Sequence, residues 1–313
     1  MNQTTSDASL QPQTASRKRI STLQRNESLA GWLFVSPMLI GLTVLTLIPI
    51  LASVVLSFAD WNFIAGLNGL KWVGFKNFEN LFEDATFLKS LGNNGIFLLT
   101  VPVYLIISLV LAILINKYVY FKSLFKVIYF MPYISSVVAV AIVWQVLFHP
   151  SNGPVNRFLM SIGIADPPKW IADTNYSLIS VMMISVWISI GFNMIVYLAG
   201  LQSIPKEMYE AAEIDGANGW TRFTRITFPL ISSTTFFLLI TGIISSFKVF
   251  DLIAVLTKGG PAGSSSVMVW YLYETAFTNL KIGYASSIAM MLFVCVLAIT
   301  LLQWIGQKKW VNY

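Results

Sequence analysis

Residues 202–229 read QSIPKEMYEAAEIDGANGWTRFTRITFP, and a long apolar run flanks this polar segment on each side. The two runs cover residues 178–201 and 230–256. Each exceeds the roughly 20 helical residues that cross the ~30 Å hydrocarbon core of a bilayer. The segment therefore predicts a polar connection between two membrane-spanning helices.

The connection is patterned like a pair of short helices. Pro205 suits the first turn of a helix, and Glu207 and Glu210 complement the positive end of the helix dipole. Gly216 can end this helix because glycine adopts a positive φ without strain. A second short helix is expected over residues 220–226, so the pattern predicts two helices joined by a glycine turn.

Small residues make this helical hairpin a candidate for docking to another protein. Ala211 and Ala212 carry little side-chain bulk, so another backbone can approach them closely. Pro229 then marks the start of the next membrane helix. Residues 202–229 are therefore expected to form a rigid element that fits a groove on a partner.

The composition of the whole chain agrees with a membrane protein. Of its 313 residues, 56% are hydrophobic and only 11% are charged, and the mean hydropathy is +0.71. Soluble proteins carry about 25% charged residues, because their surfaces must be solvated. These values exclude a soluble enzyme, a disordered protein and a secreted domain built on disulfides.

The few reactive and charged residues narrow the function further. A single cysteine, Cys295, and a single histidine, His149, form neither an internal disulfide nor a Cys/His metal cluster. The net charge of +6 comes from bases that lie mostly beside apolar segments. We therefore expect contacts with anionic lipid headgroups and none with nucleic acid.

Apolar runs long enough to span a bilayer recur along the chain. We predict an all-α integral membrane protein with one six-helix domain over residues 29–313, preceded by a polar, flexible cytoplasmic tail over residues 1–28. The first helix is expected to bend at Pro37 or Pro49. The six predicted spans are residues 32–58, 96–115, 124–148, 178–201, 230–256 and 284–305.

The basic residues predict the orientation. With the N-terminus in the cytoplasm, twelve Lys and Arg residues fall inside and seven outside, and Lys248 lies within a span. Cytoplasmic loops of membrane proteins are enriched in Lys and Arg. Both termini and residues 202–229 are therefore expected on the cytoplasmic side of a prokaryotic inner membrane.

The hairpin carries a spacing that resembles a known motif. The pattern is Glu210-Ala211-Ala212-x3-Gly216-x9-Ile226-x-Phe228-Pro229, and it resembles the EAA motif of ABC importer permeases, EAA-x3-G-x9-I-x-L-P. The one departure is Phe228, which stands in place of the usual leucine and is also apolar. Asp215, in the sequence Ile214-Asp215-Gly216-Ala217, is typical of the sugar-importing branch of this family.

The resemblance extends over residues 31–305. Its further matches are GWLFVSP at 31–37, VGFKNF at 73–78, MP at 131–132, FDLIAVLTKGGP at 250–261 and GYAS at 283–286. Together they are similar to permeases of the maltose and glycerol-phosphate type, in the carbohydrate uptake branch.

This resemblance implies a non-catalytic permease with the type I ABC importer fold. It implies a second homologous permease, two ATPase subunits that carry ATP and Mg, and an extracytoplasmic solute-binding protein that delivers a sugar, an oligosaccharide or a related polyol. The chain itself has no P-loop and is expected to hold no cofactor. The residues implied in docking to the ATPase are Glu210, Ala211, Ala212, Asp215, Gly216, Ile226 and Pro229.

A path for a sugar should combine hydrogen-bonding side chains with aromatic rings. Helical spacing places several such residues of the fourth span on one broad face. Ser and Asn at these positions could equally pack helices against each other. Lys248 and Asp251, three residues apart, are expected to form an ion pair. The predicted path residues are Ser185, Trp187, Ser189, Phe192, Asn193, Ser246, Phe250, Asp251, Tyr133 and Ser136.

The alternative function is an ion-coupled secondary transporter of a small polar solute. Proton coupling would require acidic or histidine residues near the middle of a span, and Asp251 is the one clear carboxylate within a predicted span. A membrane-embedded hydrolase finds less support, because the sequence contains neither HExxH nor GxSxG.

Overall fold

The computed structural model describes residues 22–308. It separates into two units, residues 1–52 and residues 53–313, and each is described by itself. The predicted tail, residues 1–28, lies largely outside the described residues.

The described part of the first unit, from residue 22 onward, is one interrupted helix. It consists of α1 (Thr22–Leu42), the π-helical turn η1 (Thr43–Leu47) and the beginning of α2 (Ile48–Leu56). The stretch from Asn26 to Leu56 is apolar enough to span a membrane. Pro37 lies inside α1, whereas the helical geometry changes at η1, just before Pro49. Proline cannot donate to the carbonyl four residues earlier, so the widened turn falls where this bond is missing.

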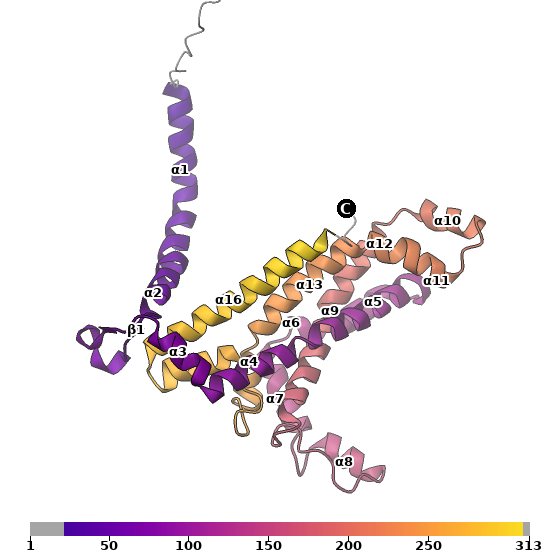
Figure 1. The fold of residues 1–313 in the computed structure, drawn as a ribbon. Helices are drawn as coiled ribbons and strands as arrows, with labels where there is room; N and C mark the ends of the chain where they lie inside the picture. The colour runs from indigo at the N-terminus through magenta and orange to yellow at the C-terminus, as the bar shows by residue number, and fades with distance from the viewer. Residues whose placement is uncertain (1–21, 309–313) are drawn as a thin grey trace, which may run out of the picture. The chain divides into compact units, whose positions relative to one another are not determined.

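The second unit is built on long apolar helices, which confirms the predicted all-α fold. In Figure 1 they run side by side. Within residues 22–308, five stretches are long and apolar enough to span a membrane, and a bent helix pair makes a sixth when it is counted as one span. The four stretches in this unit are α4 (Ala85–Phe97) with α5 (Thr100–Tyr118), α9 (Ser177–Gln202), α13 (Ser232–Phe247) with α14 (Asp251–Leu256), and α16 (Ile282–Gln307).

The span predicted over residues 124–148 is a bent helix pair. It consists of α6 (Lys122–Ile134) and α7 (Val137–Leu147), and the two helices meet at 94°. Pro132 lies in the last turn of α6 and has no N–H to donate. Ser135 then adopts an extended conformation, with ψ 152°, which ends α6.

The second span begins earlier than residue 96, where the sequence placed it. Asp84 caps α4 by accepting hydrogen bonds from the backbone N–H groups of Thr86 (2.8 Å) and Phe87 (3.2 Å). Asn93 and Asn94 read as loop residues in the sequence, but both are buried in α4. Their amide groups bind the loop around residues 263–268, including a 2.7 Å bond from Asn93 Nδ2 to the carbonyl of Ser266.

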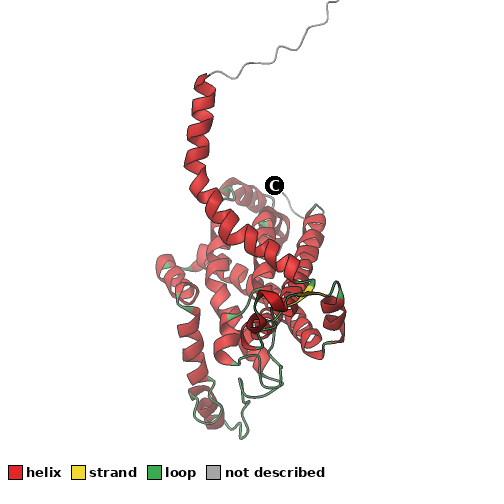
Figure 2. Cartoon of the chain, turned by 90° about the vertical axis from the view of Figure 1, so that its left-hand side faces the viewer, coloured by secondary structure: helices red, strands yellow, loops and turns green. Residues whose placement is uncertain are grey.

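Shorter elements connect the long helices. Figure 2 shows how little of the fold is strand. The strands β1 (Ala59–Asp60) and β2 (Lys71–Trp72) pair antiparallel. The remaining elements are η2 (Phe63–Ala65), η3 (Leu67–Gly69), α3 (Lys76–Glu83), α8 (Pro154–Ser161), α10 (Lys206–Ile214), α11 (Gly219–Arg222), η4 (Phe223–Thr227), α12 (Phe228–Leu230), α15 (Met268–Tyr273) and η5 (Glu274–Thr278).

One carboxylate ties several of these elements together. Asp84, at the start of α4, accepts hydrogen bonds from the hydroxyls of Tyr271 on α15 and Tyr284 on α16 (2.8 Å for Tyr284). Burial favours the neutral acid, but the hydrogen bonds from the two tyrosines and from the backbone outweigh it. The pKa of Asp84 therefore lies below its usual value. The ionised form of Asp84 clamps α4, α15 and α16.

Glycine allows the helices to approach one another closely. A Cβ at Gly191 of α9 would lie 2.0 Å from the carbonyl oxygen of Tyr129 on α6. A Cβ at Gly242 of α13 would lie 2.2 Å from the hydroxyl oxygen of Tyr104 on α5. Small residues at helix crossings are typical of membrane bundles, where packing replaces the hydrophobic effect.

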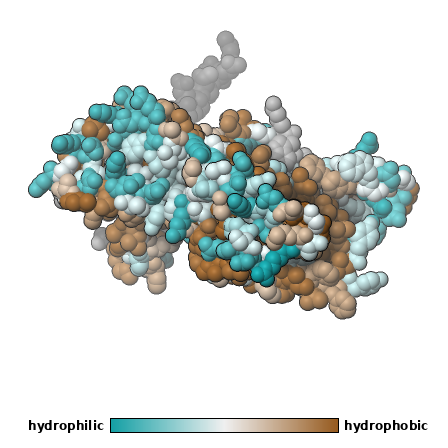
Figure 3. Space-filling view, turned by 90° about the horizontal axis from the view of Figure 1, so that it is seen from below, coloured by the Kyte–Doolittle hydropathy of each residue, from teal (hydrophilic) through white to brown (hydrophobic). Residues whose placement is uncertain are grey.

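The surface is rich in apolar side chains. Figure 3 shows hydrophobic surface between patches of hydrophilic residues on the face seen from below. Along α5, for example, Ile106 and Val110 are 64% and 50% exposed. Exposed apolar area of this extent marks contact with lipid or another protein.

Candidate functional site

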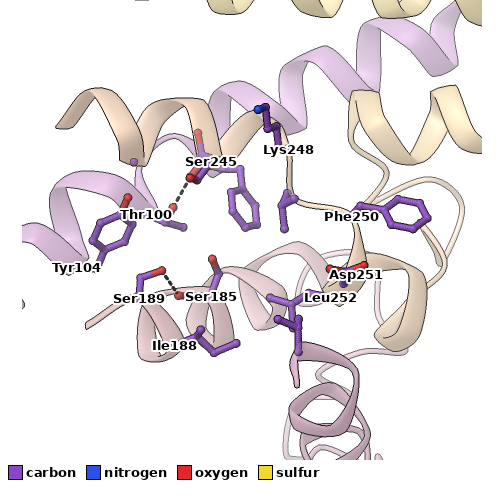
Figure 4. Close-up of a pocket in the computed structure, with 15 residues that line it drawn as sticks. Thr100, Tyr104, Ser185, Ile188, Ser189, Ser245, Lys248, Phe250, Asp251 and Leu252 are labelled. Atoms are coloured by element: carbon purple, nitrogen blue, oxygen red, sulfur yellow. Dashed lines mark hydrogen bonds between the residues drawn. The ribbon is translucent and has the colours of Figure 1, made fainter. Parts of the chain in front are cut away.

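A polar cavity lies where the fifth span is broken. The helix α13 ends at Phe247 and α14 begins at Asp251, so the backbone between them leaves the helical path. Irregular backbone at membrane depth is tolerated where it lines a cavity, because its polar groups need partners. This break borders a cavity of about 190 Å³ between α5, α9 and α13 (Figure 4).

Hydroxyl groups and two charged side chains line this cavity. Figure 4 shows Ser185 and Ser189 on α9 facing Thr100 and Tyr104 on α5. Ser245, Ser246, Lys248, Phe250 and Asp251 complete the polar and aromatic lining. The cavity therefore offers both donors and acceptors to a hydroxylated solute.

A second cavity, of about 250 Å³, adjoins the first. Tyr104, Ser189, Gly242 and Ser245 line both, and Tyr133, Phe192, Asn193 and Thr241 line the second alone. The rings of Tyr133 and Phe192 stack at 4.9 Å with an interplanar angle of 19°. The second cavity thus adds an aromatic wall to the hydroxyl groups of the first.

The polar groups on α9 are held in place by their own helix. Ser189 Oγ donates to the carbonyl of Ser185, and Asn193 Nδ2 donates to the carbonyl of Ser189, each at 2.8 Å. Each bond uses one donor and leaves acceptor oxygens on the side chain. These side chains can therefore serve as acceptors for a bound solute without changing rotamer.

Eight of the ten residues predicted for the path line one or both cavities, and two do not. Trp187 is 41% exposed and packs edge-to-face on Trp144 at 5.6 Å. Ser136, just before α7, is exposed and lines neither cavity. The structure gives no reason to keep these two in the path.

The expected ion pair between Lys248 and Asp251 is wrong. In the described part of the chain, the one ion pair joins Arg222 to Glu213. Lys248 and Asp251 are three residues apart, but the backbone between them is unwound, so the helical geometry that would bring them together is absent. Both side chains border the cavity instead.

Sequence reasoning missed the contribution of α5. Thr100 and Tyr104 line the first cavity, and both lie in a run that was read as a plain apolar span. Thr100, Tyr104 and Ser108 recur every four residues, so they form a polar stripe on one helical face. This four-residue spacing in the sequence indicates that α5 contributes polar side chains to a cavity.

The segment 202–229 forms the expected helical hairpin, which follows the C-terminal end of α9. Gly216 follows α10 with φ +74°, in the left-handed region that favours glycine. The N–H of Gly216 donates to the carbonyl of Glu213 (3.1 Å), and that of Ala217 donates to the carbonyl of Ala212 (2.9 Å). This pair of bonds is a Schellman motif, which satisfies the last carbonyls of α10.

Side-chain bonds join the two arms of the hairpin. Asn218 caps α11 by accepting from the N–H of Thr221 (2.8 Å). Arg222 Nη1 lies 3.1 Å from Glu213 Oε2, across the turn. Nearer the bundle, the hydroxyls of Tyr209 and Thr227 hydrogen-bond at 3.0 Å. These bonds link the two arms both at the turn and near the bundle.

The tip of the hairpin exposes apolar and acidic groups together. Ile214 is 87% exposed and Trp220 is 72% exposed. Glu210, Ala211, Asp215 and Gly216 are exposed, whereas Ala212, Ile226 and Pro229 are half-buried. The first arm and its turn thus form an accessible surface, and the motif residues of the second arm lie against the protein.

Together, the bundle of apolar helices, the polar cavity at a broken span and the rigid hairpin define a membrane transport protein. Comparison with known proteins identifies the family of this chain. Residues 96–311 match the family described as binding-protein-dependent transport system inner membrane component, so the chain belongs to that family.

Named relatives agree with this placement. The chain is 34% identical to the probable ABC transporter permease protein YesP of Bacillus subtilis, covering 92% of this chain and 94% of YesP. It is 33% identical to the lactose transport system permease protein LacF of Rhizobium radiobacter, covering 92% and 97%. A crystal structure of a bacterial alginate ABC transporter, in complex with a periplasmic protein bound to alginate pentasaccharide, contains a similar chain. That match has a TM-score of 0.79 and 25% identity, and it covers 92% of this chain and 96% of the other.

Proposed function

We propose that this chain is the permease subunit of an ATP-driven importer for a sugar, an oligosaccharide or a related polyol. The observation that carries the proposal is the pair of adjoining cavities at the break of the fifth span, lined by hydroxyl groups and by the Tyr133–Phe192 stack. Sugars present many hydroxyls and two apolar faces, which match this combination. A lactose permease among the relatives and the alginate transporter among the similar structures support the same substrate class.

The proposed assembly has four further subunits. A second homologous permease encloses the path together with this chain, two ATPase subunits bind ATP and Mg, and an extracytoplasmic solute-binding protein delivers the sugar. The chain has no P-loop, so the proposal assigns ATP binding and hydrolysis to the partner ATPase subunits. Family membership supports the binding-protein partner.

The hairpin is proposed to dock on one ATPase subunit. Its turn is held by the Schellman motif at Gly216, and its arms are joined by the Arg222–Glu213 pair. Ile214 supplies exposed apolar area beside Glu210 and Ala211. Because the hairpin is continuous with α9 and leads into α13, movement of a docked ATPase would displace both helices that line the cavities.

The proposed orientation places the hairpin and both termini in the cytoplasm of a bacterial cell. The support is the count of Lys and Arg in the sequence, where the segments predicted to be cytoplasmic hold twelve and those predicted to be outside hold seven. The loop around Ser264 then faces outward, toward the binding protein.

An ion-coupled transporter remains the alternative, and one observation keeps it testable. Lys248 and Asp251 border the first cavity without pairing to each other, so Asp251 is open to a coupling ion. The hairpin finds no role in that mechanism, whereas ATP-driven transport uses it directly.

Sugar uptake by the complete transporter tests the proposal. Ser189→Leu and Asn193→Leu place apolar bulk in the cavities, so both should lower uptake while the subunits still assemble. Ser123→Leu is the matched control, because Ser123 is exposed at the start of α6, lies outside the hairpin and lines neither cavity. Unchanged uptake and substrate preference in both cavity variants would mean that these residues only pack helices.

A further inference from the structure

A basic cavity lies between the end of α5 and the hairpin. Its volume is about 460 Å³, and its polar lining comes from Asn116, Lys117, Tyr209, Arg222 and Thr227. Two of these residues are cations and none is a carboxylate. Lys117 has no ion pair among the described residues, and Arg222 keeps N–H donors beyond the one that faces Glu213, so the lining favours an anion. Figure 1 shows α5 ending beside α11.

An apolar groove continues from this cavity along α5. Its volume is about 570 Å³, and it shares Ile113 and Phe223 with the basic cavity. Thr224 is its one hydroxyl-bearing residue, and that hydroxyl already donates to the carbonyl of Trp220 (3.0 Å). The lining of the groove is therefore almost wholly apolar.

The dimensions of the groove match an extended hydrocarbon chain. The groove residues Ile106, Val110 and Ile113 follow one stripe of α5, and the stripe ends at Lys117 in the basic cavity. At 1.5 Å per residue, Ile106 and Lys117 are separated by about 16 Å along the helix axis. This length accommodates most of one acyl chain, with its headgroup at the lysine.

We propose that the basic cavity and the apolar groove together bind one anionic glycerophospholipid, with its phosphate between Lys117 and Arg222 and one acyl chain along α5. The positive charges of Lys117 and Arg222 favour an anionic headgroup over a neutral one. The apolar stripe along α5 favours a lipid over a free phosphate ion, because only a lipid has an acyl chain to fill it. The site lies against the second arm of the hairpin, so bound lipid would brace the proposed coupling element. This proposal goes beyond sugar transport and needs only that the hairpin lie at a membrane surface.

Lipid retention by the full-length chain in its complete transporter tests the site. After delipidation, dioleoyl-phosphatidylglycerol or dioleoyl-phosphatidylcholine is added, and retained lipid is counted by native mass spectrometry. One phosphatidylglycerol should be retained in preference to phosphatidylcholine. Lys117→Gln should weaken this binding roughly fivefold, which is the value of one cation near an anionic surface. Val110→Trp should abolish it by filling the groove.

Matched controls separate lipid binding from structure. Arg225→Gln removes a cation three residues from Arg222 that lines neither the cavity nor the groove, so retention should not change. Glu213→Gln breaks the ion pair but keeps Arg222, so phosphatidylglycerol should still bind. Lys117 is exposed, so its substitution leaves folding intact.

Four results would overturn the proposal. The first is equal retention of the two lipids, and the second is unchanged retention in Lys117→Gln. The third is occupation of the groove by protein, detected as a cross-link from Val110→Cys to another subunit. Displacement of the lipid by inorganic phosphate alone would also contradict it, because the site would then recognise a free anion. Sugar uptake is not part of this measurement, so the two proposals fail separately.

Discussion

Gly216 offers the sharpest single perturbation of the hairpin. Its φ of +74° is unfavourable for residues that carry a Cβ, yet no atom lies within 4 Å of the position where a Cβ would stand. A substitution there therefore changes backbone preference without causing a clash. Any effect on function then reports the shape of the turn.

The expected magnitudes follow from this geometry. Alanine in the left-handed region costs about 1–2 kcal/mol, a β-branched valine costs more, and asparagine is tolerated there. A cost of 1–2 kcal/mol lowers the population of the native turn by roughly 5–30-fold relative to other local conformations. Because Gly216 is exposed, the melting temperature of the bundle should hardly change.

The assay is co-purification of the ATPase with the permease, together with sugar-stimulated ATP hydrolysis in membranes. Both should fall in the order Gly216, Gly216→Asn, Gly216→Ala, Gly216→Val. Normal coupling in Gly216→Val would refute the reasoning. Equal loss in the Asn and Val variants would also refute it, since bulk rather than backbone conformation would then be responsible.

Three further predictions address the clamp, the helix crossing and the topology. Asp84→Asn should lower the melting temperature by removing about 1–3 kcal/mol of charge-assisted hydrogen bonding, measured by thermal unfolding in detergent. Because the pKa of Asp84 is lowered in the folded protein, the wild type should lose this stabilisation as the pH falls through that pKa, whereas the variant should not. Gly242→Ala should lower sugar uptake, because its methyl group would meet the Tyr104 side chain, which lines the cavities. The amount of folded permease recovered in detergent should fall less than uptake does. An equal fractional fall in uptake and in folded permease would indicate misfolding instead. In a Cys295→Ser background, cysteines at Asn279 and Ser151 should react with an impermeant reagent from outside, and one at Thr221 only from inside; labelling of Thr221 from outside would reverse the orientation.

The sequence predicted the helical spans well, because length and hydropathy depend only on the chain itself. It failed where tertiary contacts decide. Asn93 and Asn94 looked like loop residues, and only their bonds to the loop around residues 263–268 allow them to sit inside α4. The 94° angle between α6 and α7 could not be read from hydropathy either; α6 packs against α9, whereas α7 packs against α14.

The candidate site was predicted in part. The polar face of α9 followed from helical spacing, and the structure places Ser185, Ser189 and Asn193 at the cavities. The contribution of Tyr104 was missed, although its four-residue spacing with Thr100 and Ser108 marks a polar stripe on α5; its close approach to Gly242 of α13 is visible only in the structure. The ion pair expected between Lys248 and Asp251 failed because the helix is interrupted between Phe247 and Asp251, which residue spacing alone does not reveal.

The central claim is that this chain passes a sugar through the membrane on energy supplied by a partner ATPase. The most direct test is uptake into proteoliposomes that hold the complete transporter, using the radiolabelled sugar that its own binding protein retains. We predict accumulation that requires the binding protein and ATP and persists when ionophores collapse every ion gradient. Uptake that proceeds without ATP and stops with the ionophores would contradict the account and establish the ion-coupled alternative.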